Sequence, residues 1–227
     1  MRTNTRHESM PRSLALLVGV FVLSVGSAHA TLPNLLVSSA HSDSVLRYEG
    51  EMGAFIDTFA SGGGLSFPLG LAFGPDDNLY VSSKFTNSVL RYHGQTGAFI
   101  DTFASSGGLV KLSGLLFGAD GNLYVCDFDN NSVLRYDGLT GAFIDTFASG
   151  GGLDRPVDLS FGPDNNLYVT SLDTERVLRY DGQTGDFIDT FAAGGGLDAP
   201  TFLTFVPEPA MLSLLLFGGF VALKRRR

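Results

Sequence analysis

Five oxygen-bearing side chains in the second half of the chain have the chemistry of a cation site. Asp127, Asp129 and Asn130 are close neighbours in the sequence, and Asp158 and Asp173 follow further along it. Calcium prefers carboxylate and carbonyl oxygens and takes about six to eight of them, more than these residues obviously supply. We treat the five residues as a candidate ligand or calcium site. The alternative is that they form Asx turns, in which Asp and Asn side chains bond to nearby backbone groups.

The other reactive residue types form no recognisable catalytic arrangement. Between residues 31 and 206 the histidines are His41 and His93, and no His-x-x-x-His or Cys-x-x-Cys spacing occurs. Cys126 has no basic neighbour in the sequence that would activate its thiol. We therefore predict no catalytic residue, and no cofactor other than the candidate calcium ion.

The charge balance excludes two classes of partner. Residues 31–206 carry 8 basic and 21 acidic side chains, a net charge of −13. Such a surface repels phosphate backbones and anionic lipid headgroups, so we predict no nucleic-acid partner. The single cysteine also excludes an internal disulfide.

The middle of the chain consists of four copies of one unit. The motif Val-Leu-Arg-Tyr occurs at residues 45–48, 89–92, 133–136 and 177–180, always 44 residues apart. Periods of about 40–50 residues are typical of β-propeller blades, each a small sheet that cannot bury its faces alone. No helical period of useful length appears in this region.

Each unit contains four short strand signals separated by turn residues. In the second copy they cover residues 70–73, 78–83, 88–92 and 98–104, with Gly-Pro-Asp-Asp and His-Gly-Gln-Thr-Gly as connecting turns. The recurrent Phe55, Phe59 and Phe73 are expected to fill the layers between blades. The recurrent Arg47 and Asp57 fall on neighbouring outer strands, where they could pair across each blade.

The phase of the repeat predicts how the ring closes. The first unit begins at its second strand, residues 34–39, and the last unit stops at a first strand, residues 202–205. Together they would make one shared blade, so residues 31–206 are predicted to form an all-β propeller of four four-stranded blades without open edges. The alternatives are an open arc, or an arc completed by a second chain.

Localised function is expected where the four copies differ. The loops between second and third strands vary, and so do the segments that lead into the first strands. In a propeller these loops share one face, around the mouth of the central channel. These variable segments are residues 40–43, 84–87, 127–131 and 172–176, together with 67–69, 110–113, 154–157 and 198–201.

The first 30 residues have the composition of a secretory signal peptide. A basic start precedes a mostly apolar run, and Ala28-His29-Ala30 offers a cleavage site of the small-x-small type. We expect signal peptidase to remove this segment, and the mature chain to begin near Thr31.

Residues 207–227 form a second terminal signal. Pro207, Glu208 and Pro209 precede a 14-residue apolar stretch, and four basic residues close the sequence. This order resembles the PEP-CTERM sorting signal of Gram-negative bacteria. The resemblance implies export through the inner membrane, transient membrane insertion of a C-terminal helix, processing by exosortase, and a surface or extracellular mature form. The alternative is an ordinary membrane anchor, for which a helix of about 21 Å is short.

The blade sequence resembles NHL-type propeller repeats. Residues 114–125, followed by Asp127 and residues 130–136, carry this resemblance. Propellers of related type include lactonase-like enzymes with a divalent ion over the channel. This implies an alternative in which Asp127, Asp129 and Asp158 hold a metal for a lactonase-like or lyase reaction.

The sequence favours an exported, surface-sorted propeller that acts as a non-catalytic binding or extracellular-matrix module. Its near-identical units suggest a repeated presentation surface, with extracellular polysaccharide or a surface protein as partner. The metal-dependent enzyme is the alternative. A third hypothesis is a spacer whose biological content lies in its sorting signal.

Overall fold

The computed structural model describes residues 33–206. The predicted signal peptide and sorting signal therefore lie outside the described residues. Within residues 33–206, no helix is long and apolar enough to cross a bilayer. The strands are β1 (Leu35–Ser39), β2 (Ser44–Tyr48), β3 (Phe55–Ser61), β4 (Pro68–Phe73), β5 (Leu79–Ser83), β6 (Ser88–Tyr92), β7 (Phe99–Ala104), β8 (Leu112–Phe117), β9 (Leu123–Asp127), β10 (Ser132–Tyr136), β11 (Phe143–Ser149), β12 (Pro156–Phe161), β13 (Leu167–Ser171), β14 (Arg176–Tyr180) and β15 (Phe187–Ala193), with a 3-10 turn at Ala40–Ser42.

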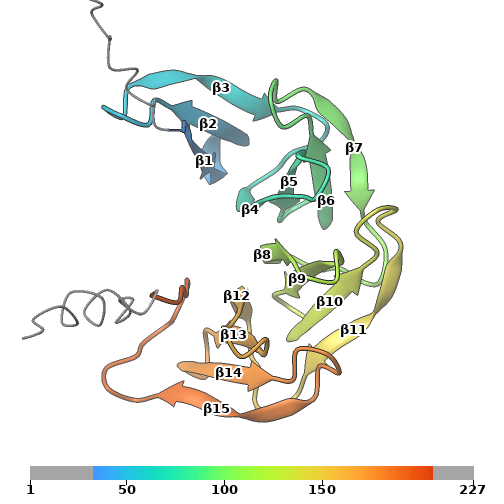
Figure 1. Cartoon of the computed structure of the whole chain (residues 1–227), viewed down its shortest axis with the longest axis vertical. Coiled ribbons are helices and arrows are strands. Elements are labelled where there is room, and N and C mark those ends of the chain that lie inside the picture. The colour runs from blue at the N-terminus through green and yellow to red at the C-terminus, as the bar shows by residue number, and fades with distance from the viewer. Residues whose placement is uncertain (1–32, 207–227) are drawn as a thin grey trace, which may run out of the picture. The chain divides into compact units, whose positions relative to one another are not determined.

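The strands form consecutive antiparallel sheets, which we call blades 1 to 4. Blade 1 contains β1–β3, and blades 2, 3 and 4 contain β4–β7, β8–β11 and β12–β15. Figure 1 shows the first strands β4, β8 and β12 lying innermost and the fourth strands β7, β11 and β15 outermost. The predicted all-β propeller with a 44-residue repeat is confirmed.

Tight turns set the register within each blade. In blade 2, Gly74 and Asn78 close the β4–β5 turn through a Gly74 N–H to Asn78 carbonyl hydrogen bond of 2.9 Å. The Asp76 Oδ1 atom accepts the Asn78 N–H at 3.1 Å, which is an Asx turn. The same arrangement recurs 44 and 88 residues later, so the turn sequence fixes all three hairpins.

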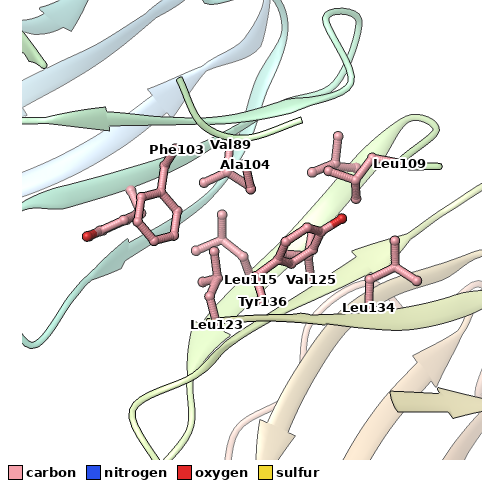
Figure 2. Close-up of a cluster of buried hydrophobic side chains, with 11 residues drawn as sticks. Val89, Phe103, Ala104, Leu109, Leu115, Leu123, Val125, Leu134 and Tyr136 are labelled. Atoms are coloured by element: carbon pink, nitrogen blue, oxygen red, sulfur yellow. The ribbon is translucent and has the colours of Figure 1, made fainter. Parts of the chain in front are cut away.

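Aromatic and aliphatic side chains fill the space between blades. Between blades 2 and 3, Val89, Phe103 and Ala104 face Leu115 and Tyr136 (Figure 2). The ring of Tyr80, also part of this core, stands edge-on to both Phe103 and Phe117, with centroids 4.8 Å apart in each case. Such edge-to-face pairs add about 0.5–1.5 kcal/mol to the burial itself.

The predicted Phe layers are correct at the Phe59 position and wrong at the Phe55 position. At the Phe73 position the copies Phe117 and Phe161 pack against the cores between blades, whereas Phe73 itself is 55% exposed. Phe59 and its copies Phe103 and Phe147 are buried, with 5–7% of their surfaces exposed. Phe55 is 58% exposed, and its copies also lie partly at the surface. The last strand of each blade contains β-bulges, and in blade 1 one register shift lies between Arg47 and Tyr48. The extra residue changes which side chains face the neighbouring blade.

The predicted arginine–aspartate pairs form in all four blades. In blade 2 the Arg91 Nη2 and Nε atoms lie 2.5 and 3.1 Å from the two carboxylate oxygens of Asp101. The guanidinium also covers the Phe103 ring, 5.2 Å from its centroid. Each pair is partly exposed and stabilises its blade modestly, by about 0–1 kcal/mol.

The predicted closing strand differs from what the structure shows. Residues 200–205 correspond to β12 one repeat earlier, and to β8 and β4 two and three repeats earlier. In the structure they lie beside blade 4, where the Leu203 N–H donates to Asp158 Oδ2 at 3.1 Å. They have no strand pairing with β1, which pairs with β2 in blade 1. Blade 1 therefore has three strands within the described residues.

Candidate functional site

The segments in which the repeats differ lie together on one side of the blades, as predicted. The Phe67 N–H donates to Asp43 Oδ1 at 2.8 Å, which joins the variable loop of blade 1 to the lead-in of blade 2. The Lys111 N–H donates to Asn87 Oδ1 at 2.8 Å, which joins the next two blades in the same way. We call this surface the variable face.

Three phenylalanine rings and one lysine form a cluster on the variable face. Phe67 and Phe85 pack with ring centroids 4.9 Å apart, and Phe85 is 60% exposed. The Lys84 ammonium lies 4.6 Å from the ring centroid of Phe128 and 5.7 Å from that of Phe67. Burial, with a smaller contribution from the nearby Lys111, lowers the pKa of Lys84. We call Phe67, Lys84, Phe85 and Phe128 the aromatic cluster.

The aromatic cluster departs from the repeat at each phenylalanine. The other three copies have Lys, Arg and Ala in place of Phe67, and His, Asp and Asp in place of Phe85. Phe128 stands where they have Ala, Lys and Leu. Blades therefore stack without these rings. The variable segments that contain these rings were predicted, but the rings themselves were not; aromatic residues confined to single copies were the available signal.

Charged pairs surround the aromatic cluster. The Lys111 ammonium lies 2.8 Å from Asp129 Oδ2, and Arg155 Nη1 lies 3.0 Å from Asp173 Oδ2. The Arg155 guanidinium also lies 5.7 Å from the Phe128 ring centroid. The variable face thus combines apolar rings with hydrogen-bonding groups of both charge signs.

Asp127 has a structural role in this arrangement. Its side chain is buried, and its oxygens accept the Val110 N–H at 3.1 Å and the Asn130 side-chain amide at 2.9 Å. Burial raises the pKa of Asp127, and these hydrogen bonds oppose the rise. Asn130 also donates to the Gly108 carbonyl at 2.8 Å, so the pair holds the blade 3 loop in place.

Below the variable face, β1, the inner strands β4, β8 and β12, and Phe202 line a cavity of about 380 Å³. Its wall includes the last residues of three segments that lead into the first strands, namely Leu69, Ser113 and Val157. The walls are mostly apolar, and Asp158 supplies a carboxylate. Burial raises the pKa of Asp158, and the hydrogen bond that its carboxylate accepts from the Leu203 N–H opposes this rise. The inner strands β8 and β12 approach each other closely here. A Cβ on Gly114 would lie only 2.8 Å from Asp158 Oδ1.

The five residues of the predicted cation site do not form one ligand set. Asp129 and Asp173 engage cations, Asp127 and Asn130 engage each other, and Asp158 bonds to the backbone of residue 203. Nowhere in residues 33–206 do three acidic, histidine or cysteine side chains gather as a metal site would require.

The other reactive residues have local roles. Cys126 is fully buried, and burial raises the pKa of its thiol well above the usual value. The His93 Nδ1 atom accepts the Gln95 and Thr96 N–H groups at 3.3 Å within a turn. His41 packs against Phe67 with ring centroids 5.4 Å apart, which extends the aromatic cluster toward blade 1.

Known proteins resemble this chain in fold. No family model matches the sequence, and no curated protein matches it. A catalytically inactive variant of virginiamycin B lyase from Staphylococcus aureus, solved with quinupristin, superposes with a TM-score of 0.57 at 14% identity. This match covers 69% of this chain and 51% of that chain.

Two further structures are similar to a comparable degree. Hydrazine synthase from Kuenenia stuttgartiensis has a TM-score of 0.57 at 19% identity, covering 69% of this chain and 45% of that chain. A chain of a nidogen/laminin complex has a TM-score of 0.55 at 21% identity, covering 70% and 59%. The chain thus spans about half the length of the solved chains it matches. The likeness to the lyase and to the nidogen/laminin chain shows the β-propeller fold.

Proposed function

We propose that this protein is a non-catalytic binding module whose variable face binds a neutral extracellular polysaccharide. The observation that carries the proposal is the aromatic cluster, which occupies positions that blade stacking does not require. Phe67 and Phe85 offer a ring surface against which the C–H face of a sugar can lie. Polar groups beside such a surface fix the orientation of a ligand.

The charges around the aromatic cluster favour a neutral polymer over a polyanion. Lys111 and Arg155 each have an acidic partner, so the cations beside the rings are compensated. The folded region as a whole carries a net charge of −13, which repels polyanions. Sugar hydroxyls can bond to both the cationic and the anionic members of these pairs.

Export and surface sorting are a further part of the proposal. They are supported by the order of elements in the sequence: a basic and apolar leader, and Pro207-Glu208-Pro209 before an apolar stretch and a basic tail. We propose that exosortase processes the chain near this motif. Glu208→Ala should abolish normal C-terminal processing, which immunoblotting of the cell-surface and membrane fractions detects. Unchanged processing would contradict the assignment.

Affinity electrophoresis of the full chain through gels containing neutral polysaccharides tests the binding proposal. Phe85→Ala should weaken retention by about tenfold, because truncating an aromatic at the centre of a binding site costs about 1–2 kcal/mol. Phe73→Ala is the matched control, since Phe73 is 55% exposed but lies at the opposite end of β4 from the variable face. Equal retention of the two variants on every polymer, or retention only on acidic polymers, would refute it.

A further inference from the structure

The three junctions between blades repeat the same contacts. The Tyr92 hydroxyl of blade 2 donates to the Gly62 carbonyl of the preceding loop at 2.9 Å. Phe99 of the same blade covers Gly63, where a Cβ would lie 2.2 Å from the ring. The hairpin glycine Gly97 lies against the Phe59 carbonyl so closely that a Cβ would lie 1.6 Å from its oxygen. Equivalent contacts join blades 2 and 3 and blades 3 and 4.

Blade 1 carries the same junction groups on a face that the described residues leave uncovered. Tyr48 corresponds to Tyr92, which is fully buried, whereas Tyr48 is only half-buried. Phe55 corresponds to Phe99 and is 58% exposed, against 41% for Phe99. Gly53 corresponds to Gly97, yet no described heavy atom lies within 4 Å of the position its Cβ would take.

Blade 4 ends with the complementary groups, also uncovered. Phe191 corresponds to the buried Phe59 but is 51% exposed. Gly195 corresponds to Gly63, and no described atom lies within 4 Å of where its Cβ would be. Phe205 packs edge-on against Tyr168 with centroids 4.9 Å apart, as Phe117 packs against Tyr80. Residues 200–205 therefore occupy the inner-strand position of a following blade.

Blade 1 has a vacant edge that residues 200–205 match. Its strand β1 corresponds to β5, which pairs with the inner strand β4 in the register Leu71 with Val81 and Phe73 with Leu79. The same register places Leu203 opposite Val37 and Phe205 opposite Leu35 one repeat away. Leu35 and Val37 are 58% and 39% exposed. An apolar strand edge of this kind is a template for pairing with another chain.

We propose that two copies of this chain associate head to tail, with residues 200–205 of each copy supplying the inner strand of blade 1 of the other. The Phe191 side of one copy would then meet Gly53 and Phe55 of the other, repeating the contacts inside the chain. Two such junctions close a ring of eight blades, the upper end of the usual range of about four to eight. A heterologous contact that closes in this way gives a finite assembly.

Three observations favour a second copy over closure within one chain. Residues 200–205 lie beside blade 4 and have no strand pairing with β1 within the described residues, although Phe202 and β1 line one cavity, so the edge of β1 is open to a second copy. In addition, the chain matches about half the length of the virginiamycin B lyase chain, a propeller. Terminal repeats of a monomeric array need polar outer faces, whereas Phe55 and Phe191 are apolar.

Disulfide trapping with the full chain tests the proposal directly. Val37→Cys and Leu203→Cys are prepared as separate variants, refolded together and oxidised; the native Cys126 is buried and takes no part. A disulfide between the two variants is expected. Leu203→Cys mixed with Val81→Cys is the matched control, because Val81 already pairs with Leu71. An intrachain disulfide in the double variant Val37→Cys/Leu203→Cys, with none between separate chains, would overturn the proposal in favour of self-closure.

Light scattering of the full chain in mild detergent gives an independent result. The expected protein mass is twice the 24.1 kDa of one chain. Phe191→Lys should reduce it to one chain, and its exposure in the single chain makes the substitution compatible with folding. Phe85→Lys, at a position on the variable face that is 60% exposed against 51% for Phe191, should leave the mass doubled. A single-chain mass for the unmodified protein would also refute the proposal.

Discussion

Gly141→Ala should destabilise the propeller through a single junction between blades. Gly141 has a φ of +71°, and a Cβ there would lie 1.9 Å from the Phe103 carbonyl oxygen and 2.9 Å from its carbon. Both contacts are with backbone, which cannot turn aside as a side chain can. The hairpin that carries Gly141 must therefore move away from blade 2, or Phe103 must move within its buried layer.

The magnitude of this effect has two contributions. The left-handed backbone costs alanine about 1–2 kcal/mol relative to glycine. Displacing the packed hairpin adds about 1–3 kcal/mol, as for other overpacked sites. Gly121→Ala isolates the first contribution, because Gly121 has a φ of +78° and no described atom within 4 Å of its Cβ position.

Thermal unfolding followed by circular dichroism compares the two variants. At about 2–4 °C per kcal/mol for a chain of this size, Gly141→Ala should melt about 2–12 °C below Gly121→Ala. Equal melting temperatures would refute the argument that the hairpin glycines are required by blade stacking. They would also remove the reason for expecting Gly53 to be covered by a second copy.

Asp158→Asn should raise the unfolding free energy at neutral pH. Burial raises the folded-state pKa of Asp158 above its usual value of 3.8. The free energy of unfolding of the native protein should therefore fall as the pH rises from about 3.8 through that higher pKa. Thermal melts at several pH values should show this fall in the native protein and not in the variant. Calcium should leave the melting temperature of the native protein unchanged, because the predicted ligands already have partners within the chain. A calcium-dependent rise in melting temperature that Asp127→Asn abolishes would restore the cation-site hypothesis. Arg135→Lys should lower the free energy of unfolding by at most about 1 kcal/mol in denaturant titrations, because lysine cannot form the bidentate pair with Asp145. A much larger loss would contradict the interpretation that this pair is exposed and screened by solvent.

The blade architecture was predictable because its determinants are local and repeated. In β6, Val89, Leu90 and Tyr92 are buried while Arg91 reaches the surface, and the same four residues recur in every unit. The fate of Phe55 was not predictable from alternation. A bulge lies between Phe55 and Phe59, and an extra residue breaks the period of two that assigns side chains to faces.

The candidate site was predictable only as a set of segments. Variation among the copies identified the loops that the structure gathers on the variable face. The partners inside it were not predictable, because Asp129 meets Lys111 and Asp173 meets Arg155 across the ends of strands that lie 18 residues apart in the sequence. Those ion pairs remove two carboxylates from the predicted cation site, and the composition of the chain alone does not reveal which residues pair.

Comparison among the four copies separates two kinds of residue. A group needed for stacking must recur at every junction, as the tyrosine of Val-Leu-Arg-Tyr does, whereas a group needed for a ligand can occur once, as Phe85 does. By this criterion, the residue types on the outward faces of blades 1 and 4 indicate whether those faces are stacked against another blade. Phe191 keeps the residue type of the buried Phe59, Phe103 and Phe147 although the described part of the chain leaves it 51% exposed, and Phe55 at 58% is more exposed than its copies at 38–41%. Exposed apolar groups retained on two complementary faces are what an assembly of identical copies requires, and a monomeric propeller would gain solubility by replacing them.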